Sequence, residues 1–219
     1  MSRHVSPDLN FEIPLWQSGF QFVAGLDEAG RGAWAGPVSA GAVILPPDPN
    51  FLNLLPGVRD SKQMTPLQRA KWAAVIKGVV LAWGVGFATH QEIDQLGIVP
   101  ATRLAMERAL GELLFSPDFL LVDALRLPHL PLPQNAIIKG DSRSLSIAAA
   151  SVLAKTERDL LMRDFDGQFP GYGFARHKGY GTAAHRAALD ELGVTKIHRC
   201  SFAPVREIML KAERLSPER

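Results

Sequence analysis

The sequence predicts an α/β protein, with a mixed β-sheet flanked by helices and a helical appendage at the C-terminal end. Three observations support this fold class. Two apolar runs typical of strands come before any helix signal. Strand and helix patterns alternate only after a third strand, and the last part of the chain carries helix signals alone. This order favours a mixed sheet over a fully parallel, doubly wound one.

Five short apolar runs predict the strands. Most are bounded by glycine, proline or acidic residues, which end strands and open turns. Gly84 and Gly86 interrupt the apolar pattern of the third run. The strands are expected at residues 22–26, 36–45, 79–87, 119–122 and 136–138.

Helix-start signals and apolar spacing predict the helices. The clearest start is Thr65-Pro66-Leu67-Gln68, which has threonine at the N-cap, proline at the first helical position and glutamine at the third. This helix should end near Gly78. Longer helices are expected at residues 100–115 and 145–165, shorter ones after Thr89, Thr182 and Pro204, and irregular chain at 171–181.

The chain has 219 residues, 47% of them hydrophobic, which is enough for one domain with a sizeable core. Neither an internal repeat nor a low-complexity linker marks a domain boundary. We therefore treat residues 1–20 as an N-terminal extension and residues 21–219 as a single domain that includes the C-terminal helices.

The charge and the cysteine content limit the partners and the cellular compartment expected for this protein. The 24 basic and 22 acidic residues allow a nucleic-acid partner without requiring one. The single Cys200 cannot form an intramolecular disulfide, which favours a reducing compartment. Residues 1–20 lack the apolar core of a signal peptide, and no run of about 18 apolar residues could span a membrane. The sequence predicts a cytoplasmic protein with no membrane partner.

The segment Gly25–Gly32 places Asp27 and Glu28 directly after the first predicted strand. Ionised carboxylates beside a buried strand are costly unless solvent, a salt bridge to Arg31 or a divalent metal compensates them. On this segment alone, an ordinary turn with glycines at positive φ is the favoured interpretation.

Two more acids favour a metal site over an ordinary turn. Asp123 ends the fourth predicted strand, and Asp141 follows the fifth. Carboxylates at one edge of a sheet can converge, and like charges in one spot repel unless cations bridge them. Oxygen ligands without histidine or cysteine suit Mg²⁺ or Mn²⁺ rather than Zn²⁺. Two such ions held by carboxylates are typical of enzymes that hydrolyse phosphodiesters.

Seven motifs occur in order along the chain: Gly25–Gly32 (GLDEAGRG), Asp60–Lys62 (DSK), Leu121–Asp123 (LVD), Lys139–Asp141 (KGD), Ile147–Lys155 (IAAASVLAK), His177–Thr182 (HKGYGT) and His198–Val205 (HRCSFAPV). Together they resemble bacterial ribonuclease HII, across residues 22–206. The resemblance implies a ribonuclease H-like fold for the catalytic domain. It also implies a catalytic quartet that binds two Mn²⁺ or Mg²⁺ ions, with matching positions at Asp27, Glu28, Asp123 and Asp141.

The same resemblance implies a substrate. In this family the turn that matches Gly30, Arg31 and Gly32 contacts the ribonucleotide 2′-hydroxyl through backbone groups. The tyrosine that matches Tyr180 packs on the sugar at an RNA–DNA junction. The implied activity is metal-dependent cleavage of RNA in RNA–DNA hybrids and on the 5′ side of ribonucleotides embedded in duplex DNA. The family also suggests a monomer and a role in removing misincorporated ribonucleotides.

The sequence departs from the family pattern at two places. Ala124 stands where glycine usually follows the third acid, and Ala33-Trp34 replaces the commoner Pro-Leu. Arg31 and the short N-terminal extension favour ribonuclease HII over the related ribonuclease HIII. A different nuclease of the same fold stays open as a function for this chain, and so does a non-catalytic module that binds RNA–DNA hybrids.

Basic side chains near these motifs could contact phosphates, and we favour Lys62 and Arg143 because they adjoin the predicted acids. The remaining candidates are Lys155, Lys178 and Arg199. Three histidines have loose spacing and no paired cysteines, which predicts capping, phosphate contact or core hydrogen bonding rather than zinc binding; they are His177, His185 and His198. Asp159 is predicted to be a salt-bridge partner on the long helix.

Overall fold

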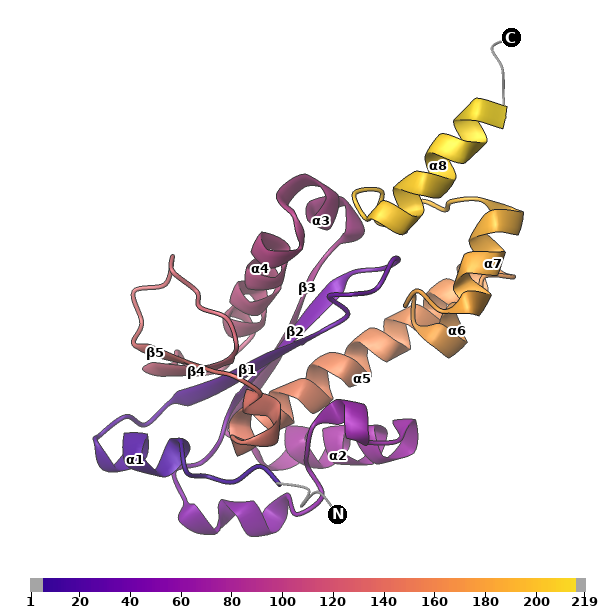
Figure 1. The fold of residues 1–219 in the computed structure, drawn as a ribbon. Coiled ribbons are helices and arrows are strands. Elements are labelled where there is room, and N and C mark those ends of the chain that lie inside the picture. The colour runs from indigo at the N-terminus through magenta and orange to yellow at the C-terminus, as the bar shows by residue number, and fades with distance from the viewer. Residues whose placement is uncertain (1–5, 216–219) are drawn as a thin grey trace.

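The computed structural model describes residues 6–215 and contains a five-stranded mixed sheet with strand order β3-β2-β1-β4-β5 (Figure 1). Its strands are β1 (Val23–Ala29), β2 (Val38–Ile44), β3 (Ala82–Ala88), β4 (Phe119–Asp123) and β5 (Gln134–Ile137). Neighbouring strands β1, β2 and β3 run antiparallel, whereas β4 and β5 run parallel to β1. The predicted mixed sheet is confirmed.

Helices cover both faces of this sheet (Figure 1). They are α1 (Glu12–Gln17), α2 (Pro66–Val79), α3 (His90–Leu96), α4 (Ile98–Gly111), α5 (Leu145–Gln168), α6 (Phe174–His177), α7 (Ala183–Leu192) and α8 (Ala203–Leu215), with short 3₁₀ turns at Pro49–Leu54, Ser61–Gln63 and Gly140–Ser142. Helices α3 and α4 pack on one face, and α2 and α5 on the other. No helix in this part of the chain is long and apolar enough to cross a membrane.

The predicted helix starts are confirmed where local capping decides them. Thr65 and Gln68 form a reciprocal capping box at the start of α2, and Thr89 and Glu92 form a second one at α3. Thr182 accepts a hydrogen bond from the backbone N–H of His185 and so caps α7. These helices begin where their own side chains satisfy the first free N–H groups.

The predicted end of the first strand is wrong. β1 does not stop at Leu26, because its ladder with β2 continues to the Ala29–Ser39 pair. Its pairing with β4, however, does stop at Leu26, opposite Val122. Asp27 and Glu28 therefore lie inside a strand, but beyond the part of it that β4 covers.

Helix α5 lies unusually close to β1 and β2. A Cβ atom at Gly25 would overlap the backbone of Ser146, and one at Gly41 would overlap the carbonyl oxygen of Ala150. The facing turn of α5 consists of small, fully buried residues, Ala148 to Ala150. Small residues on both sides let the helix backbone approach the sheet directly, which sets the first turns of α5 against β1 and β2.

Segments near both ends of the described chain pack against α5. In the N-terminal extension, the carboxylate of Glu12 is fully buried and accepts hydrogen bonds from the Ser144 hydroxyl at 2.6 Å and the Ser146 backbone N–H at 3.0 Å, at the first turn of α5. Burial raises the pKa of Glu12. Helices α6 and α7 lie at the far end of α5 (Figure 1). Their residues Phe174 and Leu189 form an apolar cluster with Met162 of α5. Helices α6 and α7 of the C-terminal region are thus docked on α5.

Candidate metal centre and nucleic-acid groove

Three of the four predicted acids converge. Among the described residues, one carboxylate oxygen from each of Asp27, Asp123 and Asp141 lies within 4.8 Å of the others. Strand register explains the meeting, because Asp27 and Asp123 follow the last β1–β4 pair, Leu26 and Val122. Asp141 joins them from the 3₁₀ turn that separates β5 from α5.

The surroundings of these carboxylates are short of positive charge. Asp27 is 1% exposed; its Oδ1 accepts the backbone N–H of Glu28 at 2.7 Å, and its Oδ2 has no hydrogen-bond partner within the described chain. Asp123 Oδ1 accepts the backbone N–H of Gly140 at 2.7 Å. The nearest cation is Lys62, whose Nζ lies 3.5 Å from Asp141 Oδ2. One exposed lysine does not balance three converging carboxylates.

Glu28 lies beside this group but is not one of the three acids whose oxygens lie within 4.8 Å of one another. Its charge still raises the pKa of Asp27. One oxygen of Glu28 accepts a hydrogen bond from Arg31 at 3.1 Å, and its Oε2 has no partner among the described residues although it is buried. The Arg31 salt bridge considered from the sequence therefore forms, but it uses only one of the two Glu28 oxygens.

The pKa values of the acids reflect this crowding. Burial, the neighbouring Glu28 charge and the Asp123 and Asp141 charges raise the pKa of Asp27 well above its ordinary value of 3.8. Burial also raises the pKa values of Glu28 and Asp141. Burial alone would lower the pKa of Lys62, but the surrounding carboxylates raise it. The site holds more negative charge than its protein surroundings stabilise.

These residues fit a hard divalent cation. All of the converging donors are carboxylate oxygens, and the buried, unpartnered oxygens of Asp27 and Glu28 are the groups that a metal ion would satisfy. The cluster contains no nitrogen or sulfur donor, which favours Mg²⁺ or Mn²⁺ over Zn²⁺. The structure thus supports a metal site of the predicted chemical type.

A groove of about 570 Å³ opens next to the acids. It brings together most of the residues predicted to bind nucleic acid, which lie far apart in the sequence. Its lining includes Glu28, Gly30, Arg31, Gly32, Ser61, Lys62, Arg69, Lys155 and Tyr180. Tyr180 reaches it because its backbone pairs with that of Ala33 in an isolated antiparallel bridge. The glycine turn and the tyrosine therefore face the same space.

Arg143 lies elsewhere. Its guanidinium sits over the ring of Phe11, 4.9 Å from the centroid, and the side chain is exposed. It does not line the groove, although Asp141 is only two residues away. Its predicted contact with phosphate remains a prediction.

Two buried arginines hold the glycine turn in place. Arg199 donates to the carbonyl oxygens of Gly30, Arg31 and Gly36 at 2.8–2.9 Å. Arg158 donates at 2.8–3.1 Å to three further carbonyls, those of Ala35, Pro37 and Lys178. Gly30 has φ +91°, and a Cβ there would overlap the Arg158 side chain. The turn therefore needs glycine both for its conformation and for its contact with arginine.

The prediction that Arg199 contacts phosphate is wrong. Its side chain is fully buried and all its bonds go to backbone oxygens. Burial and the neighbouring Arg158 lower the pKa of Arg199 to about 9, which leaves it charged at neutral pH. The role of Arg158 was not predicted from the sequence, although this arginine falls in a buried row of α5 made up of Ser151, Ala154, Arg158 and Met162. The sequence did offer one signal for a buried arginine: Arg158 stands at a position where the helical repeat calls for an apolar residue.

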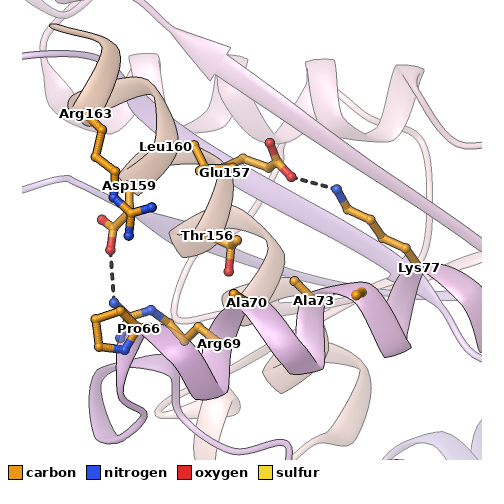
Figure 2. A pocket seen from close by; sticks show the side chains of 11 residues that line it. Pro66, Arg69, Ala70, Ala73, Lys77, Thr156, Glu157, Asp159, Leu160 and Arg163 are labelled. Carbon is orange, nitrogen blue, oxygen red and sulfur yellow. Dashed lines mark hydrogen bonds and ion pairs between the residues drawn. The ribbon is translucent and has the colours of Figure 1, made fainter. Parts of the chain in front are cut away.

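Helices α2 and α5 are joined by ion pairs (Figure 2). Asp159 accepts from Arg69 at 3.0 Å and from Lys155 at 2.7 Å, and Glu157 accepts from Lys77 at 2.6 Å. Between the helices lies a smaller hollow of about 290 Å³. The predicted role of Asp159 as a salt-bridge partner is confirmed, and the pair fixes Lys155 at the edge of the groove.

Both departures from the family pattern have structural consequences. Ala124 adopts φ 52°, in the left-handed region that glycine occupies without strain, at an ordinary cost of about 1–2 kcal/mol. Trp34 packs against Gly181, where any side chain would overlap the indole ring. The strain at Ala124 lies directly after Asp123, while the larger Trp34 is accommodated.

We expect Asp27→Asn to be at least as stable as the wild type without metal at neutral pH. Because the folded-state pKa of Asp27 is raised above 3.8, the folded protein keeps a proton that the unfolded chain has released. Wild-type stability without metal should therefore fall as the pH rises from about that value through the raised pKa, and asparagine should remove this fall.

Thermal unfolding between pH 4 and 8, with and without Mn²⁺, measures this effect. Mn²⁺ at about 100 times its dissociation constant should stabilise the wild type by about 2.7 kcal/mol, and Asp27→Asn by much less. Asp190→Asn, at a 41% exposed position, is the control and should respond to Mn²⁺ like the wild type. Strong destabilisation of metal-free Asp27→Asn would instead make Asp27 a structural partner.

Two bacterial proteins named ribonuclease HII resemble this chain over nearly its whole length. It is 52% identical over 208 residues to a protein named ribonuclease HII from Syntrophotalea carbinolica, covering 95% of this chain and 97% of that protein. A protein of the same name from a Synechococcus species is 53% identical over 210 residues, covering 95% and 93%.

Solved structures share the fold. Ribonuclease H2 from Pyrococcus horikoshii OT3 superposes with a TM-score of 0.73 at 26% identity, over 88% of this chain and 99% of that one. This match confirms the ribonuclease H-like fold predicted from the motifs. The model of the family described as Ribonuclease HII matches residues 24–205. On these grounds the chain belongs to the ribonuclease HII family and is a hydrolase of the ribonuclease H type.

Proposed function

We propose that this protein is a metal-dependent endoribonuclease that cleaves RNA in RNA–DNA hybrids and on the 5′ side of ribonucleotides embedded in duplex DNA. The cuts would leave 3′-hydroxyl and 5′-phosphate ends. The observation that carries the proposal is the placement of three converging aspartates beside a groove lined by the Gly30–Gly32 turn and Tyr180. The acids supply a metal site, and the groove supplies a means of recognising the sugar. We further propose that it acts as a monomer in the cytoplasm, removing misincorporated ribonucleotides.

Asp27, Asp123 and Asp141 would hold two Mn²⁺ or Mg²⁺ ions, with the free Oε2 of Glu28 completing the ligand set. Bound there, the ions would supply an activated water and stabilise charge on the leaving oxygen. A related fold, that of Bst-RNase HIII, has been solved in complex with Mn²⁺, at a TM-score of 0.70 and 19% identity. Lys62 neutralises Asp141 when no cation is bound, and a cation would free its ammonium group for a phosphate.

Recognition of one ribonucleotide would rest on the backbone of the glycine turn. A 2′-hydroxyl both donates and accepts a hydrogen bond, so backbone N–H and C=O groups can read it. Arg199 already occupies the carbonyls of Gly30 and Arg31, which holds the turn rigid. Gly32 has open space around its Cα, so a sugar can come close to the backbone there. Tyr180 would then pack on the neighbouring deoxyribose.

Digestion of two substrates tests the proposed activity. One is a DNA duplex with a single ribonucleotide, and the second is a long RNA–DNA hybrid. The wild type should cut both with Mn²⁺ or Mg²⁺ and neither with chelator, while Asp27→Asn should cut neither. Metal-independent binding without cleavage would favour a hybrid-binding module. Cleavage of all-DNA duplex would favour another nuclease of this fold, and cleavage of the hybrid alone would favour a ribonuclease HIII-like enzyme.

We expect Tyr180→Ala to lose more activity on the single-ribonucleotide duplex than on the long hybrid. By analogy with aromatic stacking on bases, the loss should be about 1–3 kcal/mol, or roughly 5- to 150-fold in kcat/KM. Circular dichroism should show an unchanged fold. Equal losses on both substrates would show that Tyr180 does not read the junction.

The salt dependence of binding tests the two proposed phosphate contacts. Lys62→Ala should weaken binding to all hybrid sequences alike and flatten the log–log salt slope by about one unit. The same change is expected for Arg143→Ala, whose exposed guanidinium lies outside the groove. An unchanged slope in Arg143→Ala would place the nucleic-acid path away from Phe11, and unchanged slopes in both variants would place it on another surface.

A further inference from the structure

The three histidines that are loosely spaced in the sequence form one buried cluster behind Tyr180. His185 is fully buried, and His198 and His177 are 1% and 8% exposed. The rings of His177 and His185 stack with centroids 4.4 Å apart, and those of His185 and His198 lie 5.3 Å apart. Phe174 packs on all three rings. The cluster is shielded from solvent, so each ring nitrogen needs a partner inside the protein.

The hydrogen bonds of His198 and His185 permit only one arrangement of protons. His198 Nδ1 accepts the backbone N–H of Thr195 at 2.9 Å, so the proton of this neutral ring is on Nε2. That Nε2 lies 3.1 Å from Nε2 of His185 and donates to it. His185 must then carry its own proton on Nδ1, which faces the carbonyl oxygen of Tyr180 at 3.0 Å. A carbonyl only accepts, so the assignment is consistent from end to end.

His177 makes a further hydrogen bond to the same segment. Its Nδ1 accepts the backbone N–H of Gly179 at 3.2 Å, and its Nε2 donates to the carbonyl of Tyr172 at 2.7 Å. The residues on both sides of Tyr180 are fixed as well, because the Gly179 carbonyl accepts from the Trp34 N–H at 2.7 Å and the Thr182 N–H donates to the Tyr180 carbonyl at 2.8 Å.

Burial keeps the rings of His185 and His198 neutral at physiological pH. It lowers the pKa values of His185 and His198 to about 4 in each case. The geometry acts in the same direction, since an additional proton on His198 Nδ1 would face the Thr195 N–H, and one on His185 Nε2 would face the His198 N–H. The chain of bonds from Thr195 to Tyr180 therefore stays intact across the neutral range.

This chain of bonds ends on the backbone of the residue that lines the groove. The Tyr180 ring is held beside Lys155 Nζ and the Arg158 guanidinium, at 5.4 Å and 5.5 Å from its centroid. Its carbonyl is fixed by His185 and Thr182 on one side, and its backbone is paired with Ala33 on the opposite side. Because the position of the Tyr180 ring depends on the position of its backbone, the histidines help to fix the ring relative to the glycine turn.

We propose that His198 and His185 form a directional hydrogen-bond relay that positions Tyr180 for the discrimination of a single ribonucleotide in duplex DNA. Neither histidine touches the groove, so both are positioning residues rather than catalytic ones. The relay rests on the proposed function, because it acts through the role of Tyr180 at the RNA–DNA junction. Under this proposal helix α7, which carries His185, and helix α6, which carries His177, contribute to substrate selection.

NMR of the ring nitrogens tests the relay without any substrate. In the wild-type protein, His185 should be in the Nδ1–H form and His198 in the Nε2–H form, both unchanged between pH 5.5 and 8. The opposite form in either ring, or titration of either ring in that range, would overturn the relay.

Kinetics of matched variants test its role in selection. His185→Phe keeps a ring in the stack but removes both hydrogen bonds, and it should lower kcat/KM on the single-ribonucleotide duplex relative to the long hybrid by about 3- to 10-fold. His185→Asn keeps an amide N–H toward the Tyr180 carbonyl and should recover part of that ratio. In a Tyr180→Ala background, His185→Phe should cause no further change in the ratio.

Tyr172→Phe is the control. It removes a hydroxyl that donates to Gly193 at 2.8 Å in the same helical unit but has no bond to Tyr180, so the substrate ratio should not change. An unchanged ratio in a folded His185→Phe variant overturns the relay, as does an equal loss on both substrates. If His185→Phe does not fold, His185→Asn and the ring-nitrogen assignment decide. A wild-type protein that leaves the single-ribonucleotide duplex uncut overturns the proposed function instead.

Discussion

The close contact between α5 and the sheet is the constraint on which the rest of the structure depends. Gly25 and Gly41 remove side chains from the sheet surface, and Ala148 to Ala150 do the same for the helix. Because the backbones then nearly touch, the 3₁₀ turn that precedes α5 brings Asp141 close to Asp27 of β1. Further along, the same helix directs Lys155 and Arg158 toward Tyr180 and the glycine turn. A larger residue at either glycine would move both halves of the site at once.

Two buried arginines of this arrangement do not pair with the clustered aspartates. Arg158 and Arg199 are buried, and each gives three hydrogen bonds to backbone carbonyls rather than to carboxylates. Asp27 consequently keeps an unpartnered oxygen and a raised pKa within the folded protein. A buried acid without a cation is destabilising, and under the proposed function this free oxygen is a group that a metal ion would bind.

Features that depend on neighbouring residues could be predicted from local sequence patterns. The capping box at Thr65 and Gln68, the cap at Thr182 and the acids at Asp123 and Asp141 all follow from neighbouring residues, and each lies where the sequence placed it. The misses depend on distant partners. β1 extends to Ala29 because β2 pairs with it there.

The role of Arg199 could not be predicted either, because the carbonyls it binds come from residues more than 160 positions away. The burial of Glu12 likewise depends on the start of α5, so the sequence of the N-terminal extension alone gave no sign of it. In each case the residues that bind the side chain lie far away in the sequence. The composition and spacing near Arg199 or Glu12 therefore do not indicate these partners.

The two halves of the site are stabilised by different kinds of interaction. The acid half depends on charge, so its electrostatics change when a cation binds. The half that contains the glycine turn and Tyr180 depends on polar groups whose charges do not change: arginines bound to carbonyls, and neutral histidines bound to one another and to the Tyr180 backbone. A cation bound at the acids would therefore change the charge beside the groove, whereas none of these bonds involves a carboxylate. Under the proposed function, the shape that would select the sugar is present before a metal ion binds, and recognition would not have to be rebuilt in each catalytic cycle.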